Sequence, residues 1–143
     1  MLLFVYGTLK RGHGNNRILQ SSEYVTDAVT REPFVLLRTG FPVMMREPNI
    51  GFATRHWLPV QGEVWNIRHP EVWARLDGLE GVPHMYTRGK TIVQFPTLEG
   101  AGEGPQKEVE TYLGNPDMWY RRFNGKNYQE SLCAVRDGAY LFE

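Results

Sequence analysis

Cysteine is nearly absent from this sequence, since Cys133 is the only one among 143 residues. A single thiol excludes an internal disulfide framework and is typical of a reducing compartment. Because Ala134 and Val135 follow it, we interpret Cys133 as a buried structural thiol in preference to a nucleophile. The cysteine content therefore favours a cytoplasmic protein.

An excess of charge of either sign is also missing. Sixteen Lys and Arg balance sixteen Asp and Glu, so no net field attracts nucleic acid or an acidic membrane surface. The apolar runs are too short to span a bilayer, and an apolar strand begins at Leu2, so we expect no signal peptide ahead of it. These absences predict a soluble protein with neither nucleic-acid nor membrane partners.

Patterns that bind metals or nucleotides are missing too. His56, His69 and His84 have no partners at metal-ligand spacing. The glycines between residues 7 and 14 lack the spacing of a dinucleotide-binding loop, and no Gly-Lys-Ser/Thr of a phosphate loop follows them. The sequence therefore predicts neither a metal nor a cofactor.

What is present is a large apolar and aromatic content, 41% and 13% of residues respectively, which argues against disorder. The length predicts one domain spanning residues 1–143. Short β-type runs separated by Gly and Pro predict an α+β fold with a mixed or antiparallel sheet that curls toward a barrel. The expected strands cover residues 2–5, 24–30, 34–37, 43–45, 60–67, 90–95, 109–113 and 139–142.

The clearest helix begins at Pro70, a residue that suits the first helical position, and ends at Gly81, a typical C-terminal cap. One apolar face carries Val72, Trp73, Leu76 and Leu79. Glu80 then falls in the last turn, where the helix dipole destabilises a carboxylate by up to about 1 kcal/mol. A carboxylate in the last turn goes against the usual charge preference of a helix C-terminus. Glu80 is therefore a candidate functional residue. The alternative is a solvated glutamate that the helix tolerates.

Three other segments carry expectations. Asn127 with Glu130 resembles a capping box and predicts a short amphipathic helix that runs to Val135 and stops at Gly138. Residues 98–106 are rich in Gly and Glu and are expected to form an exposed loop. The aromatic residues 118–120 are expected to pack in the core, with a pocket wall as the alternative.

The opening run from Leu2 to Gly12 is a buried strand that stops at Gly7. Glycine reaches backbone angles that other residues do not reach cheaply, and we expect Gly7 to use this freedom. Backbone N–H groups beyond the strand have no ladder partner, so they are able to bind an anion or a carbonyl oxygen. A structural β-turn is the alternative interpretation.

Three motifs, in this order, resemble the γ-glutamylcyclotransferase-like (AIG2-like) family, and the first is most similar to its γ-glutamylamine cyclotransferase branch. They are Val5-Tyr6-Gly7-Thr8-Leu9-Lys10-Arg11-Gly12, Gly62-Glu63-Val64-Trp65 and Leu76-Asp77-Gly78-Leu79-Glu80-Gly81, followed by Tyr86 and Arg88. The resemblance covers residues 2–95 and, more loosely, 107–113. Three motifs in the correct order are more specific than any one of them alone.

The resemblance implies a small β-barrel flanked by short helices, with a cavity at the glycine turn. It also implies a reaction in which the free α-amine of a γ-glutamyl group attacks its own γ-carbonyl, releasing an amine and 5-oxoproline. Glu80 stands at the family's catalytic acid/base position. The backbone of Tyr6, Gly7, Thr8 and Leu9 stands at its substrate-binding loop. This chemistry needs no metal and no cofactor.

Other side chains have alternative roles. Arg88 is expected to orient Glu80 or bind a substrate carboxylate, with an ion pair to Asp77 as the alternative. Tyr86 packs against the site or contacts the substrate, and Glu63 is either a second cavity carboxylate or points outward into solvent. Residues 98–106 and 119–123 are candidates for contacting the distal end of the substrate. A non-catalytic small-molecule-binding or regulatory protein of the same fold is the alternative to the enzyme.

Overall fold

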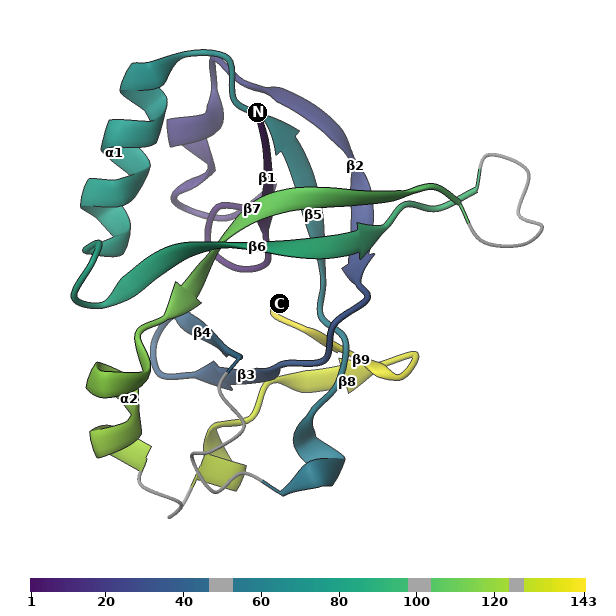
Figure 1. The fold of residues 1–143 in the computed structure, drawn as a ribbon, viewed down its shortest axis with the longest axis vertical. Helices are drawn as coiled ribbons and strands as arrows, with labels where there is room; N and C mark the ends of the chain where they lie inside the picture. Colours follow the sequence, from purple (N-terminus) through teal and green to yellow (C-terminus); the bar gives the residue numbers. More distant parts are fainter. Residues whose placement is uncertain (47–52, 98–103, 124–127) are drawn as a thin grey trace.

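The centre of the molecule is a closed five-stranded barrel with the strand order β1-β5-β2-β6-β7 (Figure 1). In the computed structural model the described residues are 1–46, 53–97, 104–123 and 128–143. The barrel strands are β1 (Leu2–Val5), β2 (Glu23–Thr30), β5 (Gln61–Asn66), β6 (Tyr86–Gln94) and β7 (Gln106–Gly114). Only the β1–β7 pair is parallel, so the predicted mixed barrel of an α+β fold is confirmed.

The strand β1 lies in the core of the barrel, as its uninterrupted apolar run predicts. Leu3 and Phe4 are fully buried, and β1 pairs with β5 on one side and β7 on the other. A Cβ atom on Gly62 of β5 would lie 2.3 Å from the Val5 carbonyl oxygen and 2.7 Å from the Phe4 ring. Glycine is therefore needed at position 62 because the neighbouring strand approaches too closely for a side chain.

Two hairpins pack below the barrel in the view of Figure 1. One consists of β3 (Val35–Arg38) and β4 (Pro42–Met45), joined by a turn in which Gly40 has a φ of 94°. The other consists of β8 (Ala134–Arg136) and β9 (Ala139–Leu141) near the C-terminus. The predicted strands of residues 34–37, 43–45 and 139–142 are therefore confirmed to within a residue or two at their ends.

The helix α1 (Pro70–Glu80) has the bounds that the sequence predicts. Pro70 occupies the first turn, and Gly81 closes the helix in the left-handed conformation with φ 64°. Leu76 is fully buried where α1 lies against the barrel and beside the 3₁₀ helix η1 (Asn16–Leu19). Leu79 differs from its prediction, because it is 43% exposed and does not belong to the buried face.

The prediction of a C-terminal helix that reaches Val135 is wrong. The chain forms a 3₁₀ turn, η4 (Tyr128–Ser131), and then the exposed strand β8, because pairing with β9 outweighs the short helical pattern. Asn127, the expected cap of that helix, lies outside the described residues. A third 3₁₀ helix, η3, spans Thr54–His56.

The second α-helix is α2 (Pro116–Phe123), which the sequence interpretation missed. We predicted a turn from the run Gly114-Asn115-Pro116-Asp117. The same residues also form a helix start, with Pro near the first position and an acidic residue in the first turn. The Asp117 N–H donates a 3.2 Å hydrogen bond to Asn115 Oδ1, as an N-cap does.

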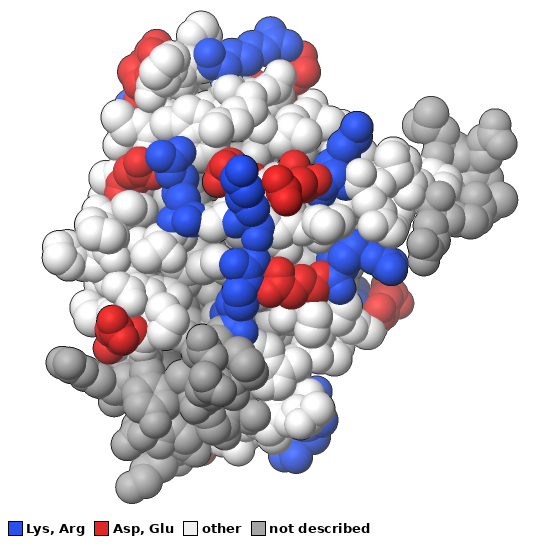
Figure 2. Space-filling model, in the orientation of Figure 1, with Lys and Arg blue, Asp and Glu red and all other residues white. Residues whose placement is uncertain are grey.

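Charges of both signs alternate over the described surface. Figure 2 shows Lys and Arg interspersed with Asp and Glu on one face of the molecule. Several are ion-paired, for example Arg46 with Glu32 at 2.6 Å and Arg68 with Glu23 at 2.7 Å. This face therefore has no extended area of one sign. Within the described ranges, no helix has the length and hydropathy to cross a membrane.

Candidate active site

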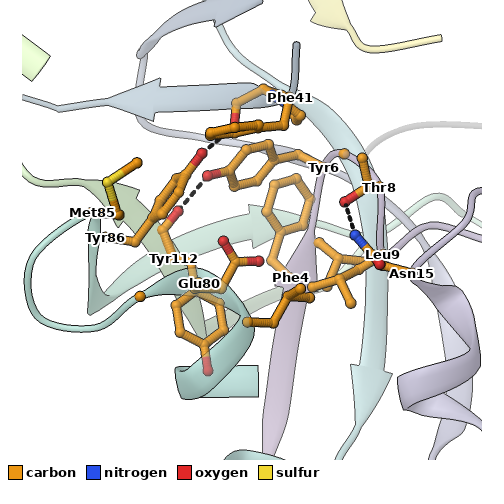
Figure 3. Close-up of a pocket in the computed structure, with 15 residues that line it drawn as sticks. Phe4, Tyr6, Thr8, Leu9, Asn15, Phe41, Glu80, Met85, Tyr86 and Tyr112 are labelled. Atoms are coloured by element: carbon orange, nitrogen blue, oxygen red, sulfur yellow. Dashed lines mark hydrogen bonds between the residues drawn. The ribbon is translucent and has the colours of Figure 1, made fainter. Parts of the chain in front are cut away.

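A cavity of about 320 Å³ lies where the loop after β1, the β3–β4 turn and the end of α1 meet (Figure 3). This volume is at the lower end of the range for small-molecule sites. The residues that line it come from β1 and its loop, β3–β4, α1 and its cap, and β6 and β7. They are Phe4, Val5, Tyr6, Gly7, Thr8, Leu9, Asn15, Phe41, Pro42, Leu79, Glu80, Gly81, Met85, Tyr86 and Tyr112.

Glu80 carries the only carboxyl group among the described residues that line this cavity. Burial raises the pKa of its carboxyl group from 4.5 to about 7, because an apolar environment disfavours the charged form. Among the described residues no hydrogen bond or ion pair involves the Glu80 carboxylate. The helix dipole alone predicts a rise of less than about one pKa unit, so burial accounts for most of the rise.

The loop after β1 is held in place by two asparagines. The Asn15 N–H donates to the Thr8 carbonyl oxygen at 3.1 Å, and Asn15 Nδ2 donates to Thr8 Oγ1 at 3.0 Å. Asn16 Nδ2 donates to the Leu9 carbonyl oxygen at 2.7 Å. The carbonyl groups of the loop are thus satisfied within the protein, which fixes the path of its backbone.

The amide groups of the same loop have no such partners. Within the described part of the chain, the N–H groups of Gly7, Thr8 and Leu9 donate no hydrogen bond, although all three residues line the cavity. Buried or half-buried amides are normally paired, so unpaired amides beside a cavity are available to a ligand. The same loop also contains the structural β-turn named as the alternative, in which the Lys10 N–H donates to the Gly7 carbonyl oxygen at 3.0 Å.

The reason for glycine at position 7 differs from the prediction. The φ angle of Gly7 is not positive, whereas that of Gly12 is 84°. A Cβ on Gly7 would instead lie 2.1 Å from Cγ of Pro42, and Pro42 is held by a 2.7 Å hydrogen bond from the Tyr86 hydroxyl to its carbonyl oxygen. Close packing against Pro42 therefore excludes a side chain, and the sequence does not show this contact.

Three tyrosines form the buried wall of the cavity, and each hydroxyl donates to a fixed acceptor. Tyr6 donates to the Tyr112 carbonyl oxygen at 2.5 Å, and Tyr86 donates to the Pro42 carbonyl oxygen. Tyr112 donates to Asp77 Oδ1 at 2.7 Å. Burial raises the pKa of all three phenols well above 10, so they stay neutral, and among these four acidic groups only Glu80 titrates near neutral pH.

Arg88 lies outside the cavity, behind the last turn of α1. Its Nε is 3.4 Å from Asp77 Oδ1, and its guanidinium carbon is 4.7 Å from the centre of the Trp73 ring. The structure thus forms the Asp77 ion pair named as the alternative. The Arg88 guanidinium group forms no hydrogen bond or ion pair with a described side chain of the cavity wall, and Glu80 is not its partner.

Glu63 takes neither of its predicted positions. Its side chain is only 10% exposed, so it does not point into solvent, and it is absent from the cavity wall. It accepts hydrogen bonds from the Arg11 N–H at 3.0 Å, from Arg11 Nε at 3.1 Å and from Trp65 Nε1 at 3.2 Å. Glu63 is a paired carboxylate of β5 that lines a second hollow together with Lys10 and Arg11.

Of the two segments expected to contact the distal end of the substrate, residues 104–106 and Trp119 are described with their side chains, and they do not line the cavity. Residues 98–103 lie outside the described residues, as do the side chains of residues 120–123. Trp119 is buried in the core, with its ring 6.0 Å from Phe41 and 6.2 Å from Tyr86, which is the packing role that the sequence favoured.

The lining residues that the sequence interpretation did not assign to the site are Phe4, Val5, Asn15, Phe41, Pro42, Leu79, Gly81, Met85 and Tyr112. Phe41 is in the predicted turn Gly40-Phe41-Pro42 and is 40% exposed. A large aromatic residue in a turn is a signal that would have pointed to it, whereas the positions of Leu79 and Met85 depend on how α1 ends against the barrel. The described residues hold no cluster of three or more His, Cys, Asp or Glu side chains that would bind a metal ion.

Known proteins are similar to this chain in sequence. The family model "Gamma-glutamyl cyclotransferase, AIG2-like" matches residues 3–133. Gamma-glutamylaminecyclotransferase B of Danio rerio is 35% identical over 119 residues, which cover 78% of this chain but only 58% of that protein. The gamma-glutamylaminecyclotransferase of Rattus norvegicus is 34% identical over 119 residues, which cover 78% of this chain and 74% of that protein.

A solved structure is similar as well. The crystal structure of an AIG2-like protein from Mus musculus aligns with a TM-score of 0.64 and 26% identity, over 91% of this chain and 86% of that one. The match of the family model over most of the sequence and the curated relatives above 30% identity agree with the three motifs. This chain therefore belongs to the AIG2-like γ-glutamyl cyclotransferase family of enzymes.

Proposed function

We propose that this protein releases 5-oxoproline and an amine from a γ-glutamylamine or a related γ-glutamyl conjugate, with Glu80 as general acid and base. One observation carries the proposal: a single cavity holds both an unpaired carboxyl group with a pKa of about 7 and three unpaired backbone N–H groups. The carboxyl group is suited to moving protons, and the amides are suited to binding oxygens.

The proton transfers follow from the pKa of Glu80. The α-amine of the substrate is protonated near neutral pH and is then no nucleophile. The Glu80 carboxylate accepts a proton from the ammonium group, and the free amine attacks the γ-carbonyl carbon. The protonated Glu80 then donates that proton to the leaving nitrogen as the C–N bond breaks, which regenerates the carboxylate. The attacking nitrogen still carries one proton more than the lactam needs, and the same carboxylate passes that proton to the released amine, which leaves as an ammonium ion. A pKa of about 7 suits both steps, because the group accepts and donates a proton readily at neutral pH.

The oxygens of the substrate need donors that are already in place. Attack on the γ-carbonyl produces a tetrahedral oxyanion, and preorganised N–H groups stabilise such an oxyanion best. The amides of Gly7, Thr8 and Leu9 are rigid because Asn15 and Asn16 hold the carbonyls of the same loop. We assign these amides to the γ-oxyanion and the α-carboxylate of the γ-glutamyl group.

Ring closure is intramolecular, so the site has to fold the substrate rather than bring two molecules together. Well-oriented intramolecular reactions gain about 7–11 kcal/mol from positioning. The wall of Tyr6, Tyr86 and Tyr112 is fixed by hydrogen bonds through every hydroxyl. A rigid wall of this kind supports the bent conformation in which the α-amine reaches the γ-carbonyl.

The alternative of a non-catalytic binding protein is less well supported by Glu80. An unpaired, partly buried carboxyl group destabilises the fold whenever it is ionised. A protein that only binds a small molecule gains nothing from that group unless the ligand pairs with it. The enzyme uses the same group in both of its protonation states.

The direct test is the Glu80→Gln variant, assayed for 5-oxoproline release from a panel of γ-glutamyl amides. Glutamine keeps the size of the side chain but moves no protons, so we expect turnover to fall by about 10²- to 10⁴-fold. Glu71→Gln is the matched control, since Glu71 is exposed in the first turn of the same helix. Unchanged turnover in Glu80→Gln would refute the mechanism, and a wild type that binds γ-glutamyl amides without turning them over would favour the binding protein.

A further inference from the structure

We infer that the mouth of the cavity is the subsite for the leaving amine, that it selects an apolar and uncharged substituent on that amine, and that Phe41 is the residue that determines this specificity. The inference rests on the proposed function, because it concerns which amine the reaction releases. It assigns a preference for alkyl and arylalkyl amines over amines that carry a second charge.

The lining residues differ in exposure, so the cavity has a buried inner wall and an exposed mouth. Phe4, Tyr86 and Tyr112 are buried and form the inner wall. Phe41 and Leu79 are 40% and 43% exposed, although both line the same cavity. Phe41 and Leu79 are the most exposed side chains of the lining, whereas Thr8 and Asn15 are half-buried. A substrate group that extends along Phe41 and Leu79 toward solvent therefore contacts apolar side chains.

The mouth is apolar on both sides. Phe41 comes from the β3–β4 turn and Leu79 from the last turn of α1, and Met85, which is partly exposed, follows α1. Figure 3 shows Phe41 and Met85 at the cavity together with Tyr86. No Lys, Arg or His is among the described residues that line the cavity, and Glu80 is its only carboxyl group.

This lining decides which substituents bind well. Methylene groups that cover Phe41 and Leu79 leave water, and each one that is fully buried strengthens binding by roughly fourfold. A second charge on the amine would be desolvated against the same apolar side chains with no described residue to pair with it. The apolar substituent is therefore favoured over a charged substituent of equal length.

Phe41 is held in place before any ligand binds. Its ring lies edge-on to Trp119 at a centroid distance of 6.0 Å and an interplanar angle of 80°, and it is 6.4 Å from the Tyr86 ring. The next residue, Pro42, is buried and accepts the hydrogen bond of Tyr86. The turn is thus anchored on both sides of Phe41, and the exposed part of a fixed aromatic ring offers a preorganised apolar contact.

The test measures kcat/KM for four synthetic amides that share the γ-glutamyl group: the methylamide, the pentylamide, the phenethylamide and the 5-aminopentylamide. We expect the pentylamide and the phenethylamide to exceed the methylamide by about tenfold or more. We expect the 5-aminopentylamide, which differs from the pentylamide mainly by a terminal ammonium group, to fall about tenfold below it.

Phe41→Ala should reduce the ratio of pentylamide to methylamide kcat/KM at least fivefold. Ile92→Ala is the matched control, because Ile92 is 45% exposed on β6 and does not line the cavity, and its ratio should match the wild type. The melting temperature of each variant is measured in parallel. Since the readout is a ratio between substrates, a general loss of folded protein does not change it.

The outcomes separate this inference from the proposed function. Absence of 5-oxoproline from all four amides overturns both. Release of 5-oxoproline with equal kcat/KM for all four amides, or with a ratio that Phe41→Ala leaves unchanged, overturns only the inference about the mouth. A preference for the 5-aminopentylamide that is lost in Phe41→Ala would also overturn it, since Phe41 would then bind a cation through its ring face.

Discussion

The Tyr112 hydroxyl donates a 2.7 Å hydrogen bond to Oδ1 of Asp77, and this contact ties the last turn of α1 to β7. Asp77 precedes Glu80 in that same turn, and Arg88 of β6 approaches the same carboxylate oxygen at 3.4 Å. Two barrel strands therefore hold the end of the helix that carries the proposed acid/base. The position of the Glu80 carboxyl group depends on these contacts although it takes part in neither.

Removing this contact should affect catalysis as well as stability. Tyr112→Phe keeps the ring in the cavity wall but loses the hydrogen bond to a charged partner, so we expect the free energy of unfolding to fall by about 1–3 kcal/mol. We also expect kcat to fall with a smaller change in KM, because Glu80 is less well positioned. Urea unfolding and steady-state kinetics on a γ-glutamyl amide measure the two effects.

The control for that variant is Tyr140→Phe. The Tyr140 hydroxyl donates a 2.6 Å hydrogen bond to the His56 carbonyl oxygen, and Tyr140 does not line the cavity. The Tyr140→Phe variant should lose about as much stability as Tyr112→Phe. It should keep the wild-type kcat at a temperature where both variants are folded. Equal losses of kcat in the two variants would contradict a positioning role for Tyr112.

The pH dependence of catalysis should report the pKa of Glu80. The carboxyl group must be ionised to accept the ammonium proton, and burial raises its pKa to about 7. We expect kcat/KM to rise with pH along a limb centred near pH 7, and to fall about tenfold per pH unit well below it. A limb centred near 4.5, the ordinary value for a glutamate, would show that the titrating group is not a buried Glu80.

Stability should change with pH in the opposite direction to kcat/KM. The folded protein holds a proton on Glu80 up to about pH 7, whereas the unfolded chain releases it near pH 4.5. Between these values the folded state binds more protons, so the free energy of unfolding falls as the pH rises. The difference of about 2.5 pKa units corresponds to an upper limit of about 3 kcal/mol, reached above pH 7.

The Glu80→Gln variant tests this directly, since it removes the titrating group. We expect the variant to be more stable than the wild type at pH 8 and to lose that advantage at pH 4, as measured by urea unfolding at several pH values. Glu71→Gln should follow the wild type throughout. A constant difference between Glu80→Gln and the wild type at every pH would contradict the raised pKa.

Gly7→Ala should destabilise the protein by about 1–3 kcal/mol through overpacking. The added methyl group would lie 2.1 Å from Cγ of Pro42, and the Tyr86 hydrogen bond restricts how far Pro42 can move. Gly14→Ala is the control, because a Cβ there meets no atom within 4 Å and the φ angle is not positive. Thermal unfolding of both variants is the measurement, and equal melting temperatures would contradict the close packing.

The carboxylate of Glu63 illustrates how far sequence reasoning reaches. The strand β5 that carries it was correctly predicted, but its partner Arg11 is 52 residues away in the chain. Whether a strand residue is solvated, paired or in a cavity depends on what the fold brings against that face. Both predicted orientations were therefore wrong.

The sequence alone was sufficient to predict the family and those structural features that depend on a few neighbouring residues. Pro70 and Gly81 define α1, and with it the position of Glu80 in the last turn, because helix ends depend on local capping. The order of three motifs indicated the family and its mixed barrel. These features follow from residues that are neighbours in the chain.

Only the tertiary structure decided the properties that make the cavity a candidate active site. The pKa of Glu80 near 7 comes from burial, and the need for glycine at position 7 comes from Pro42. The apolar side chains at the mouth come together because Phe41 and Leu79, from distant parts of the chain, line one cavity. Burial and close packing depend on contacts between residues that are far apart in the chain. For that reason the motifs indicate which residues matter, and the folded barrel determines their chemistry.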